Sequence, residues 1–343
     1  MKIAVVIPCR NEKRYIERCV FSVLNSDYPK ENIEILVCDG MSDDGTRDIM
    51  WKLISEHPSV RLIDNEKRTT PFALNLGIKT TNKPDVVIIL GAHSEIAPDY
   101  IRLCVENLQK DTSAGCVGGL LENVNEDATS AIIGIAMSSP FGVGNAHFRT
   151  GTKAGYVDTV AFGAYRKEVF EKVGLFDEEL VRNQDDEFNF RVTKTGFKIV
   201  LDPEIRSKYY VRAEFSKLFR QYYQYGLWKV YVNRKHKAVT SMRQLAPPVF
   251  VLFLFSLVLV PVSFCFTSFG IIVAATWILF FALYIFGGVL ACMKQKAKPA
   301  QFPGIIYSFF LLHSGYGTGY LHGILKFIIL RRQPGTKEGR LSR

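Results

Sequence analysis

Residues 246–292 carry no charged side chain, and no other feature constrains the fold of this chain as strongly. Within this stretch, residues 249–266 and 269–292 are apolar runs, each long enough to cross the hydrocarbon core of a bilayer as a helix of about 20 residues. The break at Thr267 and Ser268 leaves room for little more than a tight turn, so we predict a helical hairpin. Lys and Arg flank the hairpin on both sides, which by the positive-inside rule places both of its ends in the cytoplasm.

A third apolar stretch, residues 302–330, is less regular. It contains two histidines, three tyrosines and five glycines, and basic residues both precede and follow it. Charge on both sides favours a re-entrant or interfacial segment, and a third spanning helix is the alternative. The membrane region is thus expected over residues 246–330, between a basic juxtamembrane linker at 231–245 and a basic cytoplasmic tail at 331–343.

The overall charge agrees with a membrane location. The formal net charge is +10 although 48% of the residues are hydrophobic, a combination that favours a membrane surface over nucleic acid, for which no recognition motif is visible. The N-terminus starts with a strand pattern instead of the apolar segment of a signal peptide, so residues 1–230 are expected to face the cytoplasm at the cell membrane. Seven cysteines without C-x-x-C spacing argue against a metal knuckle or a disulfide framework, and Cys9 and Cys38 are expected to be reduced and packed.

Residues 1–230 alternate between short apolar runs and amphipathic stretches, which predicts an α/β domain. Such alternation implies right-handed crossovers and a mainly parallel sheet that is covered on both faces. Ligands bind such sheets outside the carboxyl ends of the strands, so the segments that follow three of the strands should share one crevice. The expected strands are IAVVIP (3–8), IEILVCD (33–39), VRLID (60–64) and DVVIIL (85–90), and the three segments are Pro8 to Glu12, Asp39 to Thr46 and Gly91 to Glu95.

Two of these segments carry recognisable motifs. PCRNE at 8–12 is a polar turn between a strand and a helix, and alone it is an ordinary loop. CDGMSDDGT at 38–46 puts Asp39 at a strand end before a loop of Gly, Ser and Asp. Such a loop suits a nucleotide, because the carboxylate can accept from a base N–H while the loop approaches sugar and phosphate. As turn chemistry the same residues are common, so neither motif is decisive by itself.

Together, the two motifs resemble the nucleotide-sugar-binding half of glycosyltransferase family 2, whose members are inverting transferases with the GT-A fold. The family pattern is a strand ending in P-x-x-N-E and then a strand ending in D-x-x-S-x-D-G-T. ALNLGI at 73–78 is similar to the family's A-R-N-x-G segment, with Leu74 in place of the arginine. The resemblance covers residues 1–230 and implies a Rossmann-like nucleotide-diphospho-sugar transferase domain. It implies nucleotide-sugar contacts from Pro8, Arg10, Asn11, Glu12, Asp39, Ser42, Asp44, Arg68, Asn75 and Ala92.

Residues 157–196 are similar to the ExoA-like, membrane-associated subgroup of this family. There QDDEFNFRVTKTG matches the pattern E-D-x-D-L-x-x-R-x-x-x-x-G, which places Asp185 on the catalytic aspartate with Asp186 beside it. An inverting transfer needs one base within hydrogen-bond reach of the acceptor hydroxyl. Like charge from Asp186 and Glu187 is expected to raise the pKa of Asp185. The alternative is an acidic helix start that the helix dipole stabilises.

The strand ending at Leu90 leads into Gly91-Ala92-His93, where the family has D-x-D and the subgroup has D-x-H. In the family these side chains hold the divalent ion that neutralises the departing diphosphate. Here His93 matches the last ligand, Gly91 replaces the first acid and Glu95 is a further candidate ligand. Because imidazole suits Mn²⁺ better than Mg²⁺, a retained site favours manganese. Three outcomes stay open: an ion held by His93, the diphosphate and an acid such as Glu95; a site that uses Lys or Arg in place of metal; or an inactive chain.

QYGLW at 224–228 is a candidate for the acceptor side at the membrane. It resembles the Q-x-x-R-W segment of processive polysaccharide synthases in Gln224 and Trp228, but Leu227 replaces the arginine. The alternative is an amphipathic interfacial helix whose aromatic residues lie at the membrane boundary. The replacement of the arginine by Leu227 and the small number of apolar segments favour transfer of one sugar per encounter over polymer synthesis.

The stretch from Ala131 to Lys153 is a second candidate for the acceptor side. It is rich in Gly and Ser, and we expect a mobile acceptor loop. His147 and Arg149 within it are candidate contacts to the acceptor or the diphosphate, with ordinary surface residues as the alternative.

These features predict an inverting glycosyltransferase that moves a single sugar from a nucleotide-sugar, by analogy a UDP-hexose, to a lipid-linked saccharide. The reaction is expected at the cytoplasmic membrane face, in exopolysaccharide or other glycan biosynthesis. A polyprenyl-phosphate sugar synthase and a processive synthase are the alternatives within the class. From another class, the alternative is an inactive scaffold bound to other glycan-assembly proteins. No nucleic-acid partner is expected.

Overall fold

The computed structural model describes residues 1–144, 146–151, 154–211, 214–239, 242–264 and 268–335. The chain forms two compact units. The first, the sheet unit, comprises Met1–Val124 and Ala146–Tyr210, and the second, the helical unit, comprises Asn125–Asn145 and Val211–Arg343. The chain therefore leaves the sheet unit twice: once for the insertion Asn125–Asn145, and again after Tyr210.

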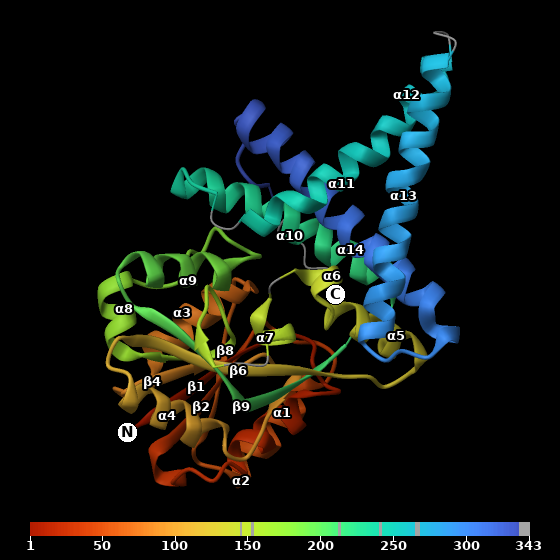
Figure 1. Ribbon diagram of the computed structural model, residues 1–343. Coiled ribbons are helices and arrows are strands. Elements are labelled where there is room, and N and C mark those ends of the chain that lie inside the picture. The colour runs from red at the N-terminus through yellow and green to blue at the C-terminus, as the bar shows by residue number, and fades with distance from the viewer. Residues whose placement is uncertain (145, 152–153, 212–213, 240–241, 265–267, 336–343) are drawn as a thin grey trace. The chain divides into compact units, whose positions relative to one another are not determined.

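Four parallel strands form one half of the sheet, in the order β3-β2-β1-β4. Strands β1, β2 and β4 are labelled in Figure 1. Helices connect consecutive strands, because a parallel pair needs a crossover. Cys9 at the end of β1 pairs with Asp39 at the end of β2, so these two strands end together. The expected strands and the α/β class are confirmed. The elements are β1 (Ile3–Cys9), α1 (Ile16–Leu24), η1 (Lys30–Asn32), β2 (Ile33–Asp39), α2 (Thr46–Glu56), β3 (Val60–Asp64), α3 (Thr70–Thr80) and β4 (Val86–Ile89).

The other half of the sheet is mixed and continues as β8-β6-β9-β5, with β7 paired to β9. Strand β8 runs antiparallel to both β4 and β6, whereas β6 and β9 are parallel. The mainly parallel character that the sequence predicts thus applies to the half that carries the two nucleotide-type motifs. The elements are β5 (Ser94–Ile96), α4 (Tyr100–Lys110), β6 (Ala114–Val124), α7 (His147–Thr150), β7 (Gly155–Tyr156), β8 (Ala161–Arg166), α8 (Lys167–Val173), α9 (Gln184–Lys194) and β9 (Lys198–Tyr210).

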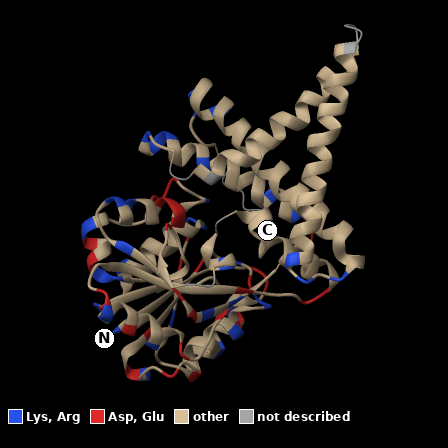
Figure 2. Ribbon diagram, viewed as in Figure 1, with Lys and Arg blue, Asp and Glu red and all other residues tan. Residues whose placement is uncertain are grey.

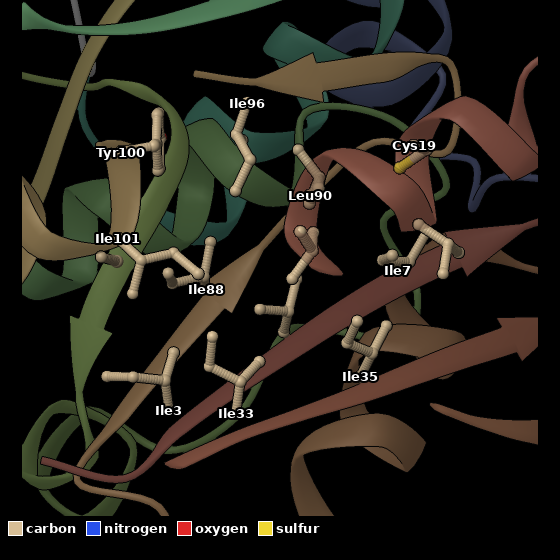
Figure 3. Close-up of a cluster of buried hydrophobic side chains, with 14 of the residues drawn as sticks. Ile3, Ile7, Cys19, Ile33, Ile35, Ile88, Leu90, Ile96, Tyr100 and Ile101 are labelled. Atoms are coloured by element: carbon tan, nitrogen blue, oxygen red, sulfur yellow. The ribbon is translucent and has the colours of Figure 1, made fainter. Parts of the chain in front are cut away.

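Apolar side chains of β1 alternate between the two faces of the sheet, so each face has its own core. Ile3, Val5 and Ile7 belong to one cluster, part of which Figure 3 shows. Ala4 and Val6 belong to the cluster on the opposite face. Full burial of one isoleucine side chain contributes about 1.5–3 kcal/mol, so a strand buried on both faces is strongly fixed in register.

The cysteines of the described chain are free thiols, and all six are buried. Burial raises the pKa of Cys38 to about 12 and raises that of Cys104 well above its ordinary value, so these thiols stay protonated at neutral pH. The expectation of reduced, packed Cys9 and Cys38 is confirmed, while Cys265 lies outside the described residues.

The helical unit is organised around α14, which packs along α10 and also contacts α11 and α13. The insertion adds α5 and α6 to the same helix. The elements are α5 (Ala128–Met137), α6 (Pro140–Val143), α10 (Phe215–His236), η2 (Met242–Leu245), α11 (Ala246–Phe255), η3 (Ser256–Val258), α12 (Leu259–Ser263), α13 (Ser268–Lys294), η5 (Pro299–Gln301), α14 (Phe302–Gly323) and the π-helical η6 (Ile324–Ile329).

Two segments of the helical unit are long and apolar enough to cross a membrane. They are Ala246–Ser263 and Phe269–Lys294, and only 17% and 6% of their most apolar windows are buried within the protein. Figure 2 shows α12 and most of α13 without charged residues. By length and composition these segments match the predicted hairpin, and the turn expected at Thr267 lies outside the described residues.

The third apolar stretch is one helix, α14, continued by a π-helical turn. Its glycines let the backbones of α10 and α14 approach each other closely. A Cβ atom added at Gly319 would lie 2.0 Å from the carbonyl oxygen of Tyr223, and one at Gly226 would lie 2.0 Å from that of Tyr316. This contact explains why a membrane-type segment is so rich in glycine. Gly315 and Gly323 lie in the same way against the carbonyl oxygens of Phe219 and Leu227.

Replacing Gly319 with alanine should destabilise the pairing of α10 with α14. The added methyl group would have to displace backbone atoms, and overpacking of this kind costs about 1–3 kcal/mol. We expect a lower midpoint of thermal unfolding for the detergent-purified Gly319→Ala protein. The matched control is Gly288→Ala on α13, where the added Cβ meets Ile306 at 3.4 Å, an ordinary contact. Equal midpoints for the two variants would contradict the proposed close helix contact.

Candidate active site

The loops after β1 and β2 are hydrogen-bonded to each other at the carboxyl edge of the sheet. The side chain of Ser42 accepts from the backbone N–H of Asn11 (2.8 Å), and Thr46 Oγ1 accepts from the N–H of Glu12 (2.9 Å). The amide of Asn11 also donates to Asp43 (2.9 Å). The expectation that PCRNE and CDGMSDDGT share one crevice therefore agrees with the structure. A depression of about 470 Å³ is lined there by Asn11, Glu12, Lys13, Arg14, Tyr15 and Asp44.

Asp44 holds the second loop in shape. Its carboxylate accepts from the N–H and hydroxyl of Thr46 and from the N–H of Lys13 (3.1 Å). Burial alone would raise the pKa of Asp44, but the hydrogen bonds from Thr46 and Lys13 outweigh it and lower the pKa. The loop therefore keeps an ionised carboxylate at the edge of the depression, next to the N-terminus of α2.

Asp39 is fully buried at the end of β2 and is surrounded by donors. It accepts from the N–H of Ser42 (3.0 Å), from the Ser42 hydroxyl and from the guanidinium of Arg47 (2.9 Å). Arg47 also bonds Asp64 at the end of β3 (2.8 Å), and this bond is the main cause of a raised Arg47 pKa. A nucleobase that bonds Asp39 would therefore share the carboxylate with Ser42 and Arg47 or replace one of them. Sequence reasoning missed Arg47, although it directly follows the D-G-T motif.

The remaining residues of the nucleotide-sugar prediction lie around this edge. Arg10 packs over Gly40, where an added Cβ would lie 3.2 Å from its side chain. Arg68 is exposed after β3 and has a left-handed backbone conformation (φ 57°), with its N–H bonded to Asn65. Pro8 precedes the last residue of β1, and Ala92 is buried after β4.

Asn75 is buried, and its amide is committed to the protein backbone. The Asn75 amide donates to the carbonyl of Phe176 (2.8 Å) and to Glu178 (3.1 Å), and its carbonyl accepts from the N–H of Phe176 (2.9 Å). In this structure Asn75 therefore fixes the segment that follows α8.

The residues after β4 form a second polar group. His93 Nδ1 lies 3.3 Å from Glu12 Oε1, so the first motif reaches the end of β4. Glu95, the other expected ligand, accepts a hydrogen bond from the hydroxyl of Tyr210. The ring of Tyr209 packs edge-on against His93, with 5.0 Å between centroids.

Arg149 of α7 contacts Tyr209, the residue that packs against His93. Its guanidinium lies 5.4 Å from the centre of the Tyr209 ring and donates to Asn123 (3.0 Å). His147, the other candidate of this segment, is exposed in the first turn of α7. The expectation of a mobile loop from Ala131 to Lys153 is wrong for the described part, because α5, α6 and α7 form there; residues 145, 152 and 153 lie outside it.

The space beside Gly91 is occupied by an aromatic ring. A Cβ atom added at Gly91 would lie 3.1 Å from Phe162 Cε1 and 3.3 Å from Ser94 Oγ. In the described part of the chain, no group of three or more His, Cys, Asp and Glu side chains is close enough to hold a metal ion. The protein thus offers His93 and Glu12 as a pair, and an ion here would need the oxygens of a bound diphosphate to complete its coordination.

Helix α9 presents the acidic segment. It begins after Asn183, and the exposed Asp185 accepts from the N–H of Asp186 (2.9 Å). Glu187 is buried and pairs with Arg191 through two bonds (2.8 and 3.0 Å). Arg191 thus offsets the charge of Glu187, and the expected effect of Asp186 and Glu187 on the pKa of Asp185 stays a prediction.

Buried side chains hold helix α9 in place. Phe188 stacks on Phe176 (4.3 Å between centroids), and Tyr165 donates from its hydroxyl to Asn189 (2.9 Å). Burial raises the pKa of Tyr165 well above its ordinary value, and the charge of Asp185 adds to this effect. Asp185 is thus an exposed carboxylate on a fixed support.

The acceptor candidates on α10 are not accessible in this structure. Gln224 is buried and Trp228 is only 1% exposed, so neither is available to stack on a sugar. Both belong to the helical unit, whereas the residues of the strand-end loops belong to the sheet unit. Their acceptor role stays a prediction.

The strand order, the two cross-linked loops and the acidic start of α9 together define a glycosyltransferase of the GT-A type. Residues 4–174 match the family model described as glycosyl transferase family 2. The dolichyl N-acetyl-alpha-D-glucosaminyl phosphate 3-beta-D-2,3-diacetamido-2,3-dideoxy-beta-D-glucuronosyltransferase of Methanococcus voltae is 31% identical, with 94% of this chain and 97% of the relative covered. The succinoglycan biosynthesis protein ExoA of Rhizobium meliloti (strain 1021) is 32% identical, with 71% of this chain and 73% of the relative covered. The chain belongs to glycosyltransferase family 2.

A solved structure shows the same fold. The mannosyltransferase PcManGT from Pyrobaculum calidifontis, in complex with GDP-Man and Mn²⁺, superposes with a TM-score of 0.61. The sequence identity is 17%, and the match covers 92% of this chain and 86% of that one. The GT-A fold predicted from the motifs is confirmed.

Replacing Asn75 with alanine should destabilise the sheet unit. The change leaves the N–H and carbonyl of Phe176 without their partner, and each buried polar group left unpaired costs about 1–3 kcal/mol. Urea unfolding of purified protein should show this loss, whereas the exposed Asn82→Ala control should unfold like wild type. An Asn75→Ala protein of unchanged stability but lower nucleotide affinity would instead support direct contact with the donor.

Proposed function

We propose that the protein is an inverting glycosyltransferase that moves a single sugar from a nucleotide-sugar, a UDP-hexose, to a lipid-linked saccharide. The reaction takes place at the cytoplasmic face of a membrane, in exopolysaccharide or other glycan biosynthesis. The observation that carries the proposal is the pair of cross-linked loops at the strand ends, where Asn11 and Asp44 line one depression. The two apolar segments of the helical unit support attachment to the membrane.

The proposed contacts to the nucleotide-sugar follow from the hydrogen-bonding groups at the carboxyl edge of the sheet. Asp39 is the acceptor for a base N–H, and it becomes available when the Ser42 hydroxyl turns away. Uracil has such an N–H beside a carbonyl, and guanine has the same pair, so the choice of a UDP-sugar rests on analogy with the family. Pro8, Arg10, Asn11, Ser42, Arg68 and Ala92 surround the nucleotide in this proposal.

The proposed sugar acceptor is based on similarity to a relative of known name. The Methanococcus voltae relative is named for transfer to a dolichyl N-acetylglucosaminyl phosphate, a lipid-linked saccharide. The similarity to that relative extends over nearly the whole chain, including the helical unit. A polyprenyl-phosphate synthase would act on bare polyprenyl phosphate, a processive synthase would make polymer, and a scaffold bound to other assembly proteins would give no product.

Asp185 is the general base of the proposed mechanism. It takes the proton of the acceptor hydroxyl while the oxygen attacks the anomeric carbon and the nucleoside diphosphate leaves from the opposite face, which inverts the configuration. The N–H of Asp186 orients the Asp185 carboxylate. When bound, a divalent ion would neutralise the leaving diphosphate, held by His93 with Glu12 or Glu95. Arg149 adds positive charge near the same strand end.

Replacing Asp185 with asparagine should abolish transfer. Removal of a general base typically costs about 10²–10⁴-fold in rate, while nucleotide binding should stay within about twofold. The assay is transfer from a panel of UDP- and GDP-sugars by detergent-purified protein. The matched control is Asp48→Asn, an exposed aspartate in the first turn of α2, which should retain activity. Equal activity of both variants would show that Asp185 only stabilises its helix.

Replacing Gly91 with aspartate should strengthen metal binding. The new carboxylate would join His93 at the same strand end, provided that the Phe162 ring shifts by a few tenths of an ångström. Mn²⁺ affinity, measured by electron paramagnetic resonance of free ion in the presence of UDP, should rise by about tenfold or more over wild type. Gly91→Asn, of the same shape but uncharged, is the control. Unchanged affinity, together with wild-type turnover that ignores EDTA, would mean that cationic side chains act in place of metal.

A further inference from the structure

Most of the helical unit carries charge of one sign. Residues 215–335 contain thirteen Lys and Arg residues and no Asp or Glu. No carboxylate side chain within this stretch can therefore neutralise these cations. A surface of one charge sign destabilises a compact unit through self-repulsion and attracts anions from outside it.

Two cationic segments that are distant in the sequence meet within the helical unit. The guanidinium of Arg234 on α10 donates to the carbonyl oxygen of Arg332 (3.0 Å), which follows η6. The hydroxyl of Tyr231 on α10 donates to the side-chain oxygen of Gln333 (2.9 Å). Two hydrogen bonds thus join the last turns of α10 to the segment after η6.

Two lysines and two aromatic rings lie at the same junction. Lys235 Nζ lies 5.7 Å from the centre of the Tyr231 ring, and Lys326 Nζ lies 5.6 Å from that of the Phe327 ring. The centroids of the two rings are 5.1 Å apart, so the lysines of α10 and η6 belong to one surface. Lys326 is half-buried, and the other cations of the junction are exposed. We call this group the cationic surface; it comprises Lys235, Lys237, Lys326, Arg331 and Arg332.

The first candidate membrane segment, Ala246–Ser263, begins beside the cationic surface. The amide of Asn233 on α10 donates to the side chain of Gln244 (2.9 Å), two residues before this segment. The same amide donates to the hydroxyl of Tyr320 on α14 (3.3 Å). Asn233 directly precedes Arg234, which bonds the segment after η6. Contacts of two neighbouring residues therefore bring the start of α11 and the cations together.

Exposed apolar side chains accompany the cations. They lie on η6 and directly beside it, at Leu325, Ile328, Ile329 and Leu330. At a bilayer surface, apolar side chains gain free energy in the boundary of the hydrocarbon core, and Lys and Arg gain it at anionic headgroups. A nucleic acid would satisfy the cations and leave the apolar side chains in water. A bilayer therefore fits this surface better than a nucleic acid does.

We propose that the cationic surface binds anionic phospholipid headgroups of the leaflet at which α11 enters the membrane. The proposal rests on membrane attachment, which is part of the proposed function, and it adds a class of lipid and the residues that recognise it. Arg331 and Arg332 contribute most, because a guanidinium can bond two phosphate oxygens at once. The alternative role of the cations is to offset the negative C-terminal ends of α10 and η6.

Native mass spectrometry of the full-length protein in detergent tests the proposal. The probe is phosphatidylglycerol, and phosphatidylcholine with the same acyl chains is the neutral reference. We expect wild type to bind phosphatidylglycerol more tightly, and Arg331→Gln/Arg332→Gln to raise its apparent Kd by about tenfold or more. Arg331→Lys/Arg332→Lys keeps the charge and should stay within about threefold of wild type.

The matched control is Lys52→Gln/Lys110→Gln, which removes two exposed lysines from the sheet unit. It loses the same net charge and should leave the Kd of both lipids unchanged. Equal Kd values of wild type for the two lipids would overturn the proposal. So would an unchanged Kd for phosphatidylglycerol in Arg331→Gln/Arg332→Gln.

Thermal unfolding in detergent separates headgroup binding from a merely structural role. Phosphatidylglycerol should raise the unfolding midpoint of wild type more than phosphatidylcholine does, because a ligand stabilises the state that binds it. Arg331→Gln/Arg332→Gln should keep the wild-type midpoint without added lipid and lose this extra rise. A lower midpoint without lipid, with the extra rise intact, would mean that the arginines only stabilise the helix ends and would overturn the proposal.

The arginine variant should fold, because both side chains are exposed and the bond from Arg234 uses the backbone carbonyl of Arg332. If it does not, Lys235→Gln/Lys237→Gln on α10 replaces it, and an unchanged Kd for phosphatidylglycerol in that variant would overturn the proposal. Tight binding of single-stranded RNA without preference for phosphatidylglycerol would also overturn it. Neither measurement uses sugar transfer, so a wild type that transfers no sugar contradicts the proposed function alone.

Discussion

Parallel pairing of β1 with β2 and β4 is the constraint on which the site depends. In this register Cys9 lies beside Asp39, and Leu90 follows the last paired residue of β4. Three loops therefore start from one edge of the sheet, and their hydrogen bonds can link them. The apolar side chains of β1 fill both cores, so a slip of one residue would exchange the two faces and separate the loops. The position of the polar residues is thus a consequence of hydrophobic packing.

The helical unit is held by different forces. Its two candidate membrane segments expose apolar side chains, so contacts within the protein contribute little to their burial. The pairing of α10 with α14 relies instead on glycines that allow backbone contact, and the insertion is tied to α14 by His313, which bonds the carbonyl of Phe141. Such contacts stabilise helix pairs through close packing. Close packing matters most within a membrane, because burial of apolar side chains from lipid contributes little free energy.

Much of the fold and part of the site could be predicted from the sequence. Continuous apolar runs marked the strands, and polar motifs directly after them marked Asn11, Asp39 and His93. The expected loop from Ala131 to Lys153 failed because α5 has little amphipathic pattern of its own, and its helix is fixed by tertiary packing on α14. The pairing of Glu187 with Arg191 was missed for a similar reason, because the sequence does not show that Glu187 is buried.

Side chains that meet from distant segments could not be foreseen. Phe162 fills the space beside Gly91 only because β8 pairs with β4, a contact between segments far apart in the sequence. Glu12 reaches His93 because two loops meet at the sheet edge. No spacing in the sequence announces either contact, and both change what can be expected of the metal site.

The most direct test of the central claim is mass spectrometry of the lipid products. Purified protein would receive a panel of α-linked UDP-sugars with either dolichyl N-acetylglucosaminyl phosphate or bare dolichyl phosphate. The account predicts addition of one sugar to the saccharide lipid, with a β linkage by nuclear magnetic resonance, and no product from the bare phosphate. A glycosylated polyprenyl phosphate, a ladder of polymer or a retained α linkage would contradict it.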